Sequence, residues 1–161
     1  VPGAYEGKGL GNQFLNILNI IPMIFFKFLI SHQMEEKNVK SVVKIMILIA
    51  TIICLIGFLV SPLVLPKIFP KFTNITEVLQ IMSFVVIPVT INLIFLSRFL
   101  RDEKVTIVLT STALYLSFQI SGIIILGNLY GINGIASAIV LSEITRTLFY
   151  FIIYRSYRVN N

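Results

Sequence analysis

Two ionisable residues, Glu143 and Arg146, lie in the middle of a long apolar segment, three positions apart. Residues at this spacing share one side of an α-helix. A charged side chain surrounded by hydrocarbon is costly, and such residues commonly recognise a charged ligand or carry an ion. The pair therefore predicts a functional site in a region of low polarity. A structural ion pair that holds the helix among its neighbours is the alternative interpretation.

A second polar set lies on one face of an earlier apolar segment. At about 100° per residue, four side chains fall within an arc of about 80°. They are Asn12, Asn16, Asn19 and Lys27. Amide and ammonium groups are expensive in hydrocarbon, so this stripe must face other helices or water, and it predicts one wall of a water-lined cavity. In the alternative, the asparagines only hydrogen-bond neighbouring helices and Lys27 extends to the lipid headgroups.

The residue types needed for covalent chemistry do not occur together. His32 is the only histidine, and neither a metal cluster nor a nucleophile with its base can be assembled around it. The glycines of residues 127–134 lack the lysine and the preceding strand of a phosphate loop. Cys54, the only cysteine, lies within an apolar run and is expected to be a small packing residue. The sequence predicts no enzyme, no metal site and no cofactor.

The composition indicates the environment in which these residues act. The chain has 161 residues, of which 57% are hydrophobic and 12% charged, and its mean hydropathy is +0.93. A soluble domain of this size cannot bury so much apolar surface. The net charge of +6 would suit a nucleic acid, but the basic residues cluster between apolar runs, as topology signals do. We therefore expect an integral membrane protein that binds no nucleic acid.

Five apolar runs reach the length of about 20 residues that a helix needs to cross a bilayer. They are residues 10–30, 45–66, 78–97, 105–126 and 134–154. Residues 127–134 are rich in glycine and predict a turn, and Pro22 and Pro88 predict bends in the first and third runs. The expected fold is an all-α polytopic transmembrane bundle, in which residues 1–161 form one unit. Because the chain starts with Val1 rather than Met, we expect a fragment of a longer protein.

Basic residues between the runs predict the orientation of the chain. Eight of them follow the first, third and fifth runs, whereas three precede the first run or follow the second. Basic residues are retained on the cytoplasmic side of a membrane. The fragment is therefore expected to begin outside the cell and to end in the cytoplasm.

Small and hydroxyl-bearing residues form narrow faces on four of the runs, which predicts close packing of helices in lipid. The face on residues 45–66 comprises Ala50, Cys54, Gly57 and Ser61. The face on residues 105–126 comprises Thr106, Thr110, Ala113, Ser117 and Ser121. The face on residues 134–154 comprises Gly134, Ala138 and Ser142. A repeat of seven residues along the third run comprises Thr76, Ser83, Thr90 and Ser97.

The order of these features resembles that of a known protein family. The first run contains Asn19-Ile-Ile-Pro22, the second ends in Ser61-Pro-Leu-Val-Leu-Pro-Lys-Ile-Phe-Pro70, and the last begins with Tyr130-Gly-Ile-Asn-Gly-Ile-Ala-Ser-Ala138. These stretches are similar to motifs of the multidrug/oligosaccharidyl-lipid/polysaccharide (MOP) flippase superfamily, and most similar to its polysaccharide and O-antigen flippases. The resemblance covers nearly the whole chain in order, through degenerate small-residue motifs.

The resemblance implies two lobes of six helices around a central cavity, of which this chain supplies most of the carboxyl-terminal lobe. It implies transport of an oligosaccharide linked to an isoprenoid diphosphate across the cytoplasmic membrane of a bacterium, for polysaccharide biosynthesis. The implied partners are membrane lipid, this substrate and the amino-terminal lobe of the same chain. A diphosphate needs a sheltered path with cationic groups. The residues expected to line it are Asn12, Asn16, Asn19, Lys27, Glu143 and Arg146.

Two other functions stay open. A drug or cation antiporter of the same superfamily would prefer acidic groups in its cavity, and only Glu143 is at hand. A membrane scaffold subunit that transports nothing would use the small-residue faces for packing and the asparagine stripe as a partner interface.

Overall fold

The computed structural model describes residue 24, residues 36–68 and residues 75–159. Nearly all of these residues are helical, and no strand occurs among them. The helices are α2 (Glu36–Ile68), α3 (Ile75–Ser83), α4 (Val86–Arg101) and α5 (Val105–Val159). Three stretches are long and apolar enough to cross a membrane, namely Lys40–Leu63, Thr76–Arg101 and Val105–Ser156. The all-α character expected from the sequence is confirmed, and the helices fit a membrane protein.

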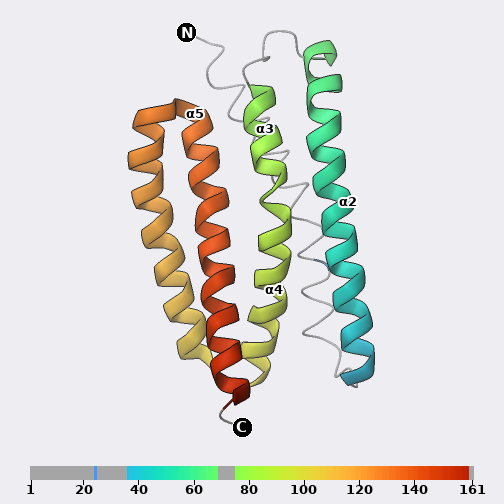
Figure 1. Cartoon of the computed structure of the whole chain (residues 1–161), viewed down its shortest axis with the longest axis vertical. Coiled ribbons are helices and arrows are strands. Elements are labelled where there is room, and N and C mark those ends of the chain that lie inside the picture. Colours follow the sequence, from blue (N-terminus) through green and yellow to red (C-terminus); the bar gives the residue numbers. More distant parts are fainter. Residues whose placement is uncertain (1–23, 25–35, 69–74, 160–161) are drawn as a thin grey trace.

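Helix α5 is a hairpin of two antiparallel arms that lie side by side (Figure 1). A straight helix of 55 residues would be about 80 Å long, far beyond the ~30 Å of hydrocarbon in a bilayer. The chain reverses at Gly131, whose φ of 59° and ψ of −134° favour glycine. A Cβ at Gly134 would overlap the Leu126 carbonyl. The turn lies within residues 127–134, where the sequence predicts it. We call residues 105–130 the first arm and residues 132–159 the second arm.

Helices α3 and α4 form one column with a break at Phe84 and Val85 (Figure 1). Pro88 has no N–H group, so the Phe84 carbonyl one turn earlier cannot accept the usual helical hydrogen bond. At the break, the chain is held by a hydrogen bond that spans three residues, and it runs from the Phe84 N–H to the Ile81 carbonyl at 3.1 Å. The bend predicted from Pro88 corresponds to this break, whereas Pro22 lies outside the described residues.

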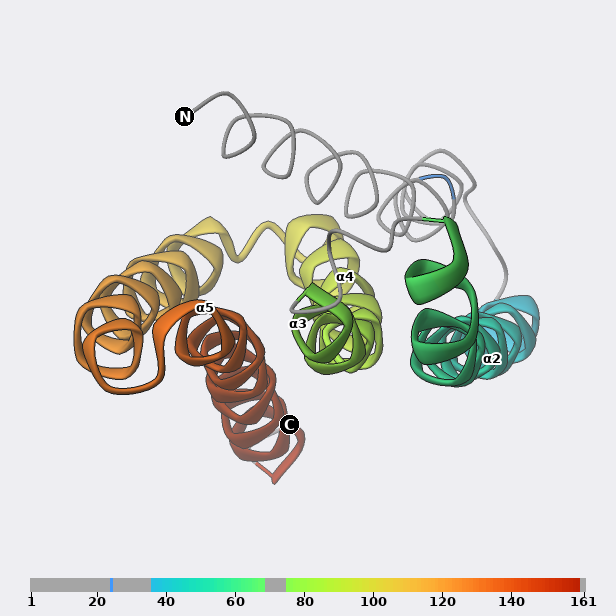
Figure 2. The same cartoon turned by 90° about the horizontal axis from the view of Figure 1, so that it is seen from above.

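Seen from above, the helices form a single curved row (Figure 2). The first arm of α5 lies at one end, followed by the second arm, the α3–α4 column and α2. Helix α2 packs against α3 and α4, and these pack against α5. Many large apolar side chains are exposed, as expected for surfaces that face lipid. The predicted first span, residues 10–30, lies outside the described residues, so the count of five spans stays a prediction.

The small-residue faces predicted on residues 45–66 and 134–154 are confirmed as buried faces. The buried members on α2 are Ala50, Cys54, Gly57 and Ser61. The buried members on the second arm are Gly134, Ala138 and Ser142. A Cβ at Gly57 would overlap the Ser83 side chain of α3, and one at Gly122 of the first arm would lie 3.0 Å from the Ala138 Cβ. On the third run, Ser83 and Thr90 are buried, while Thr76 and Ser97 are half-buried.

The face predicted on residues 105–126 is wrong as a packing face within the described structure. All its members are exposed, namely Thr106, Thr110, Ala113, Ser117 and Ser121. The first arm lies at the end of the row and meets the second arm through Ser111, Gly122 and Gly127 instead. The Thr110 and Ser117 hydroxyls each donate to a carbonyl four residues earlier at 2.9 Å. Because these hydroxyls are satisfied within their own helix, they need no neighbour.

We predict that Ala138→Leu destabilises the protein by about 1–3 kcal/mol, because the larger side chain collides with Gly122 across the hairpin. Ala113→Leu is the matched control, since Ala113 is exposed on the first arm. Thermal unfolding of both purified variants in detergent measures the difference. Equal melting temperatures would contradict packing of the arms through Ala138.

Helix α4 ends in a tight turn that fixes the start of α5. The Lys104 N–H donates to the Phe99 carbonyl at 2.8 Å, and the Glu103 N–H donates to the Leu100 carbonyl at 3.1 Å. These bonds form the Schellman pattern of a helix end. In this pattern the residue that follows the C-cap must be left-handed. The C-cap is Asp102, and the residue after it, Glu103, has a φ of 57°. A residue with a Cβ is strained in this conformation, whereas glycine is not.

Glu103→Gly should therefore raise the free energy of unfolding by about 1 kcal/mol, since relief of strain exceeds the entropy that glycine adds to the unfolded chain. Glu103→Gln removes the same charge but keeps the strained backbone, so it is the control. Unfolding in detergent compares the two variants. The strain argument fails if the glycine variant is no more stable than the glutamine variant.

Candidate functional site

Polar side chains from α4 and from both arms of α5 meet between these helices. We call this set the central polar cluster, and its members are Asn92, Ser111, Thr112, Tyr115, Glu143, Arg146, Thr147 and Tyr150. Arg146 stands near the middle of the second arm, about 22 Å from Gly131 at the rise of an α-helix. The cluster therefore lies at the depth of the hydrocarbon when α5 crosses a bilayer.

Asn92 of α4 binds the second arm through its side-chain amide. Its Nδ2 donates to the Glu143 Oε2 at 2.7 Å and to the Glu143 main-chain oxygen at 3.1 Å. The Thr147 hydroxyl lies 2.9 Å from the Asn92 Oδ1 and 2.9 Å from the Glu143 carbonyl. Asn92 and Glu143 are only 3% and 9% exposed. A buried carboxylate is costly without a donor, so this amide both stabilises Glu143 and fixes α4 against α5.

Arg146 reaches in another direction, toward the first arm. Its Nη2 donates to the Thr112 Oγ1 at 3.2 Å. Its guanidinium carbon lies 5.4 Å from the centre of the Tyr115 ring and 5.7 Å from that of Tyr150, within the range of cation–π attraction. The Tyr150 hydroxyl lies 2.6 Å from the Ser111 Oγ, which joins the two arms a second time. Residues of both arms thus hold the guanidinium in place.

Glu143 and Arg146 do not form an ion pair with each other. Arg101 and Asp102, at the end of α4, do form an ion pair. The structural ion pair that the sequence left open is therefore not found. The Arg146 Nε is buried and has no acceptor among the described residues. An unbonded donor of a charged group is unfavourable in an apolar region, so this N–H is suited to an oxygen ligand.

The structure brings together two of the six residues that the sequence predicts for a cavity. Glu143 and Arg146 both belong to the central polar cluster, where Asn92 donates to Glu143 and Arg146 donates to Thr112. The other predicted residues lie outside the described part of the chain, and they are Asn12, Asn16, Asn19 and Lys27. Their place relative to the cluster stays a prediction.

Sequence reasoning misses Asn92, Tyr115 and Tyr150. Asn92 carries a usable signal, because an amide within the uncharged run 78–97 is as costly in lipid as the asparagines of the first run. Tyr115 stands well inside its run, whereas tyrosine prefers membrane interfaces. Tyr150 gives no such signal, because it stands near the end of its run, where tyrosine is common.

No group of three His, Cys, Asp or Glu side chains within the described segments is close enough to hold a metal ion. Comparison of the chain with protein-family models, curated proteins and solved structures finds no match. The role of the central polar cluster must therefore be inferred from its own chemistry.

Asn92→Ala should lower the free energy of unfolding by about 1–3 kcal/mol, because it removes the donor on α4 from a buried carboxylate. The same change should cost less in a Glu143→Ala background, with a coupling free energy of about 1 kcal/mol. Asn128→Ala, at an exposed position of the first arm, is the control. Thermal unfolding in detergent compares the parent with the two single variants, the double variant and the control. Additive effects of the two central substitutions would mean that the bond contributes nothing.

Proposed function

We propose that this chain is part of a membrane transporter that moves a lipid-linked oligosaccharide across a bacterial cytoplasmic membrane. The observation that carries the proposal is Arg146, a guanidinium on an apolar helix with an unbonded Nε and no ion pair to Glu143. An isoprenoid diphosphate is the matching class of ligand, because hydrocarbon excludes its charge and its path needs a cationic group. The resemblance to flippases of the MOP superfamily supports the same assignment.

Arg146 can bind a diphosphate without first being released from a carboxylate. Thr112 holds its Nη2, and the rings of Tyr115 and Tyr150 lie near its guanidinium carbon. A guanidinium offers paired N–H groups that match two phosphate oxygens. Because these contacts orient the guanidinium in advance, little side-chain freedom is lost on binding.

The distribution of basic residues supports the orientation of such a transporter. Apart from Arg146, the basic residues whose side chains are described all belong to one end of the molecule. At this end α2 begins, and α4 and α5 end (Figure 1). They are Lys40, Lys44, Arg98, Arg101, Lys104 and Arg155. We assign this end to the cytoplasm by the positive-inside rule, and the turn at Gly131 to the outside.

A cation antiporter of the same superfamily is the second candidate, and Glu143 is the residue that favours it. Its carboxylate is buried, accepts a hydrogen bond from Asn92 and is not paired with Arg146. A carboxylate at this depth is suited to take up a proton or a metal cation during transport. The two candidates therefore differ in which substitution abolishes transport.

Arg146→Ala should abolish export of surface polysaccharide in a complemented bacterial strain, while the protein still accumulates in the membrane. Arg146→Lys should restore only part of the export, because an ammonium lacks the fork that binds two phosphate oxygens. Lys44→Ala removes a positive charge from an exposed position of α2 and is the control. Glu143→Gln keeps an acceptor for Asn92 and should preserve oligosaccharide export.

Other outcomes point to other functions. Full export with Arg146→Ala would exclude a substrate role for this residue. Loss of cation-coupled drug efflux in Glu143→Gln, with Arg146→Ala active, would favour the antiporter. A scaffold subunit requires that both substitutions change only the amount of assembled protein.

A further inference from the structure

A second group of basic residues lies where α4 and the second arm of α5 end together. The Arg98 guanidinium carbon lies 5.5 Å from the centre of the Tyr154 ring, which joins the two helix ends. Arg101 follows Arg98 by about one turn, Arg155 follows Tyr154, and both Arg101 and Arg155 are exposed. We call Arg98, Arg101, Tyr154 and Arg155 the basic end cluster.

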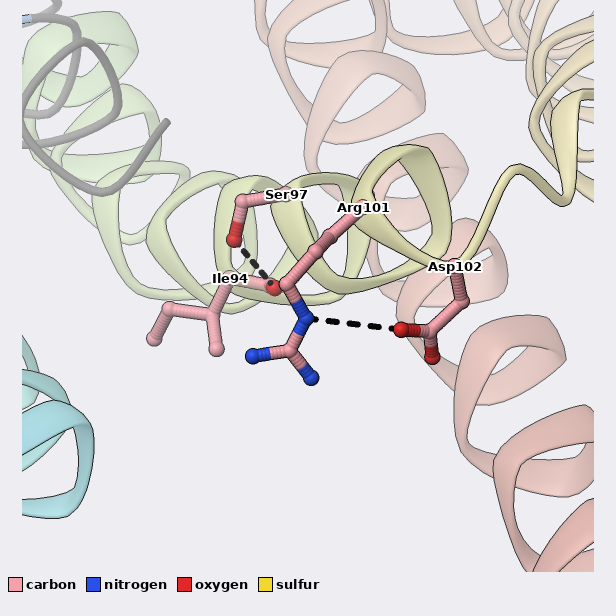
Figure 3. A network of polar contacts seen from close by, with 4 residues as sticks. All are labelled: Ile94, Ser97, Arg101 and Asp102. Carbon is pink, nitrogen blue, oxygen red and sulfur yellow. Dashed lines mark hydrogen bonds and ion pairs between the residues drawn. The ribbon is translucent and has the colours of Figure 1, made fainter. Parts of the chain in front are cut away.

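Arg101 keeps most of its guanidinium unbonded although it contacts Asp102 (Figure 3). The ion pair joins only the Arg101 Nε to the Asp102 Oδ1, at 3.4 Å, and the two side chains are 63% and 49% exposed. An exposed pair of this length contributes little stability. In Figure 3, neither terminal nitrogen of Arg101 takes part in the contact. Both terminal nitrogens can therefore bind a second anion.

The neighbouring charges leave this end of the molecule positive. Two acidic residues, Asp102 and Glu103, lie in the turn after α4, against Lys104 and the three arginines of the basic end cluster. The excess of two positive formal charges attracts anions at a membrane surface.

An exposed apolar track leads from Arg155 along the second arm toward its middle. Leu148, Phe151 and Ile152 precede Arg155 by seven, four and three positions, so all of them share one face of the helix. Their exposed fractions are 57%, 56% and 66%. An acyl chain can lie along this track while its headgroup contacts the arginine. Tyr154 lies next to Arg155 at the end of the second arm, where a tyrosine is common at a membrane interface.

We propose that the basic end cluster binds the headgroup of an anionic phospholipid, with an acyl chain along Leu148, Phe151 and Ile152. The phosphodiester contacts Arg155, and the contact between Arg98 and Tyr154 brings the end of α4 to the same site. A negative head followed by an apolar tail matches the order of these side chains, whereas a free phosphate would leave the apolar track unused. The proposal needs only that α4 and α5 lie in a bilayer, and it does not depend on the transported substrate.

Lipid retained by the full purified chain tests the proposal. The protein is purified in detergent that contains equal amounts of phosphatidylglycerol and phosphatidylcholine with identical acyl chains. Native mass spectrometry should then show that the protein retains more phosphatidylglycerol than phosphatidylcholine. Arg155→Gln should reduce that retention about fivefold, the effect of one basic residue at an anionic surface. Arg155→Lys keeps the charge and should keep most of the retention. Lys44→Gln removes a charge from the same end of the molecule but outside the cluster, so retention should not change.

Two further measurements separate a lipid from a free anion. Inorganic phosphate should not displace phosphatidylglycerol, and Phe151→Asn should weaken retention although no charge changes. Equal retention of both lipids by the parent chain, or unchanged retention in Arg155→Gln, would overturn the proposal. Displacement by inorganic phosphate together with no effect of Phe151→Asn would assign the arginines to a free anion and would also overturn it.

Discussion

In hydrocarbon every polar group must find its partner within the protein, and the hydrogen bond between Asn92 and Glu143 meets that requirement at the centre of this structure. At 2.7 Å it gives a buried carboxylate a donor, and the same amide also binds the Glu143 main chain. The bond therefore fixes the α3–α4 column against the second arm at one register. Between α3 and the second arm, Asn133 Nδ2 also donates to Glu77 Oε2 at 2.7 Å, but that bond is exposed. Aromatic rings meet as well, such as Phe99 with Tyr150 at 5.4 Å, and apolar contacts specify register less because they lack direction.

The contacts of Arg146 differ from those of Glu143. The guanidinium, three positions later, is bound by the first arm through Thr112 and Tyr115. One face of the second arm thus serves two interfaces, with an anion on one side and a cation on the other. The two side chains form no ion pair with each other, so each keeps contacts of its own that a purely structural ion pair would lack.

The sequence predicts the helices and two packing faces better than it predicts the site. Small residues such as Ala50 and Ala138 are informative, because backbones approach closely only where side chains are small. The face with Thr110 and Ser117 misleads, because a hydroxyl that donates to its own helix is satisfied on an exposed face as well as on a buried one. Spacing places Glu143 and Arg146 on one helix, but it cannot reveal that the carboxylate is bound by Asn92, 51 positions earlier.

The depth of Arg146 explains why its charge is held so differently from those at the helix ends. Near the middle of the second arm it cannot extend to a headgroup, and an arginine there costs about 2.5–3.5 kcal/mol on insertion scales. Two tyrosine faces at ~0.5–2 kcal/mol each and the bond to Thr112 at ~1 kcal/mol offset nearly all of that cost without using the Nε. The charge therefore needs no carboxylate beside it, and its unbonded N–H gains most from an oxygen ligand. Arg101 and Arg155 are exposed, so water already satisfies them and dissolved ions screen their attraction for an anion. Salt should therefore weaken binding at the helix ends far more than binding at Arg146.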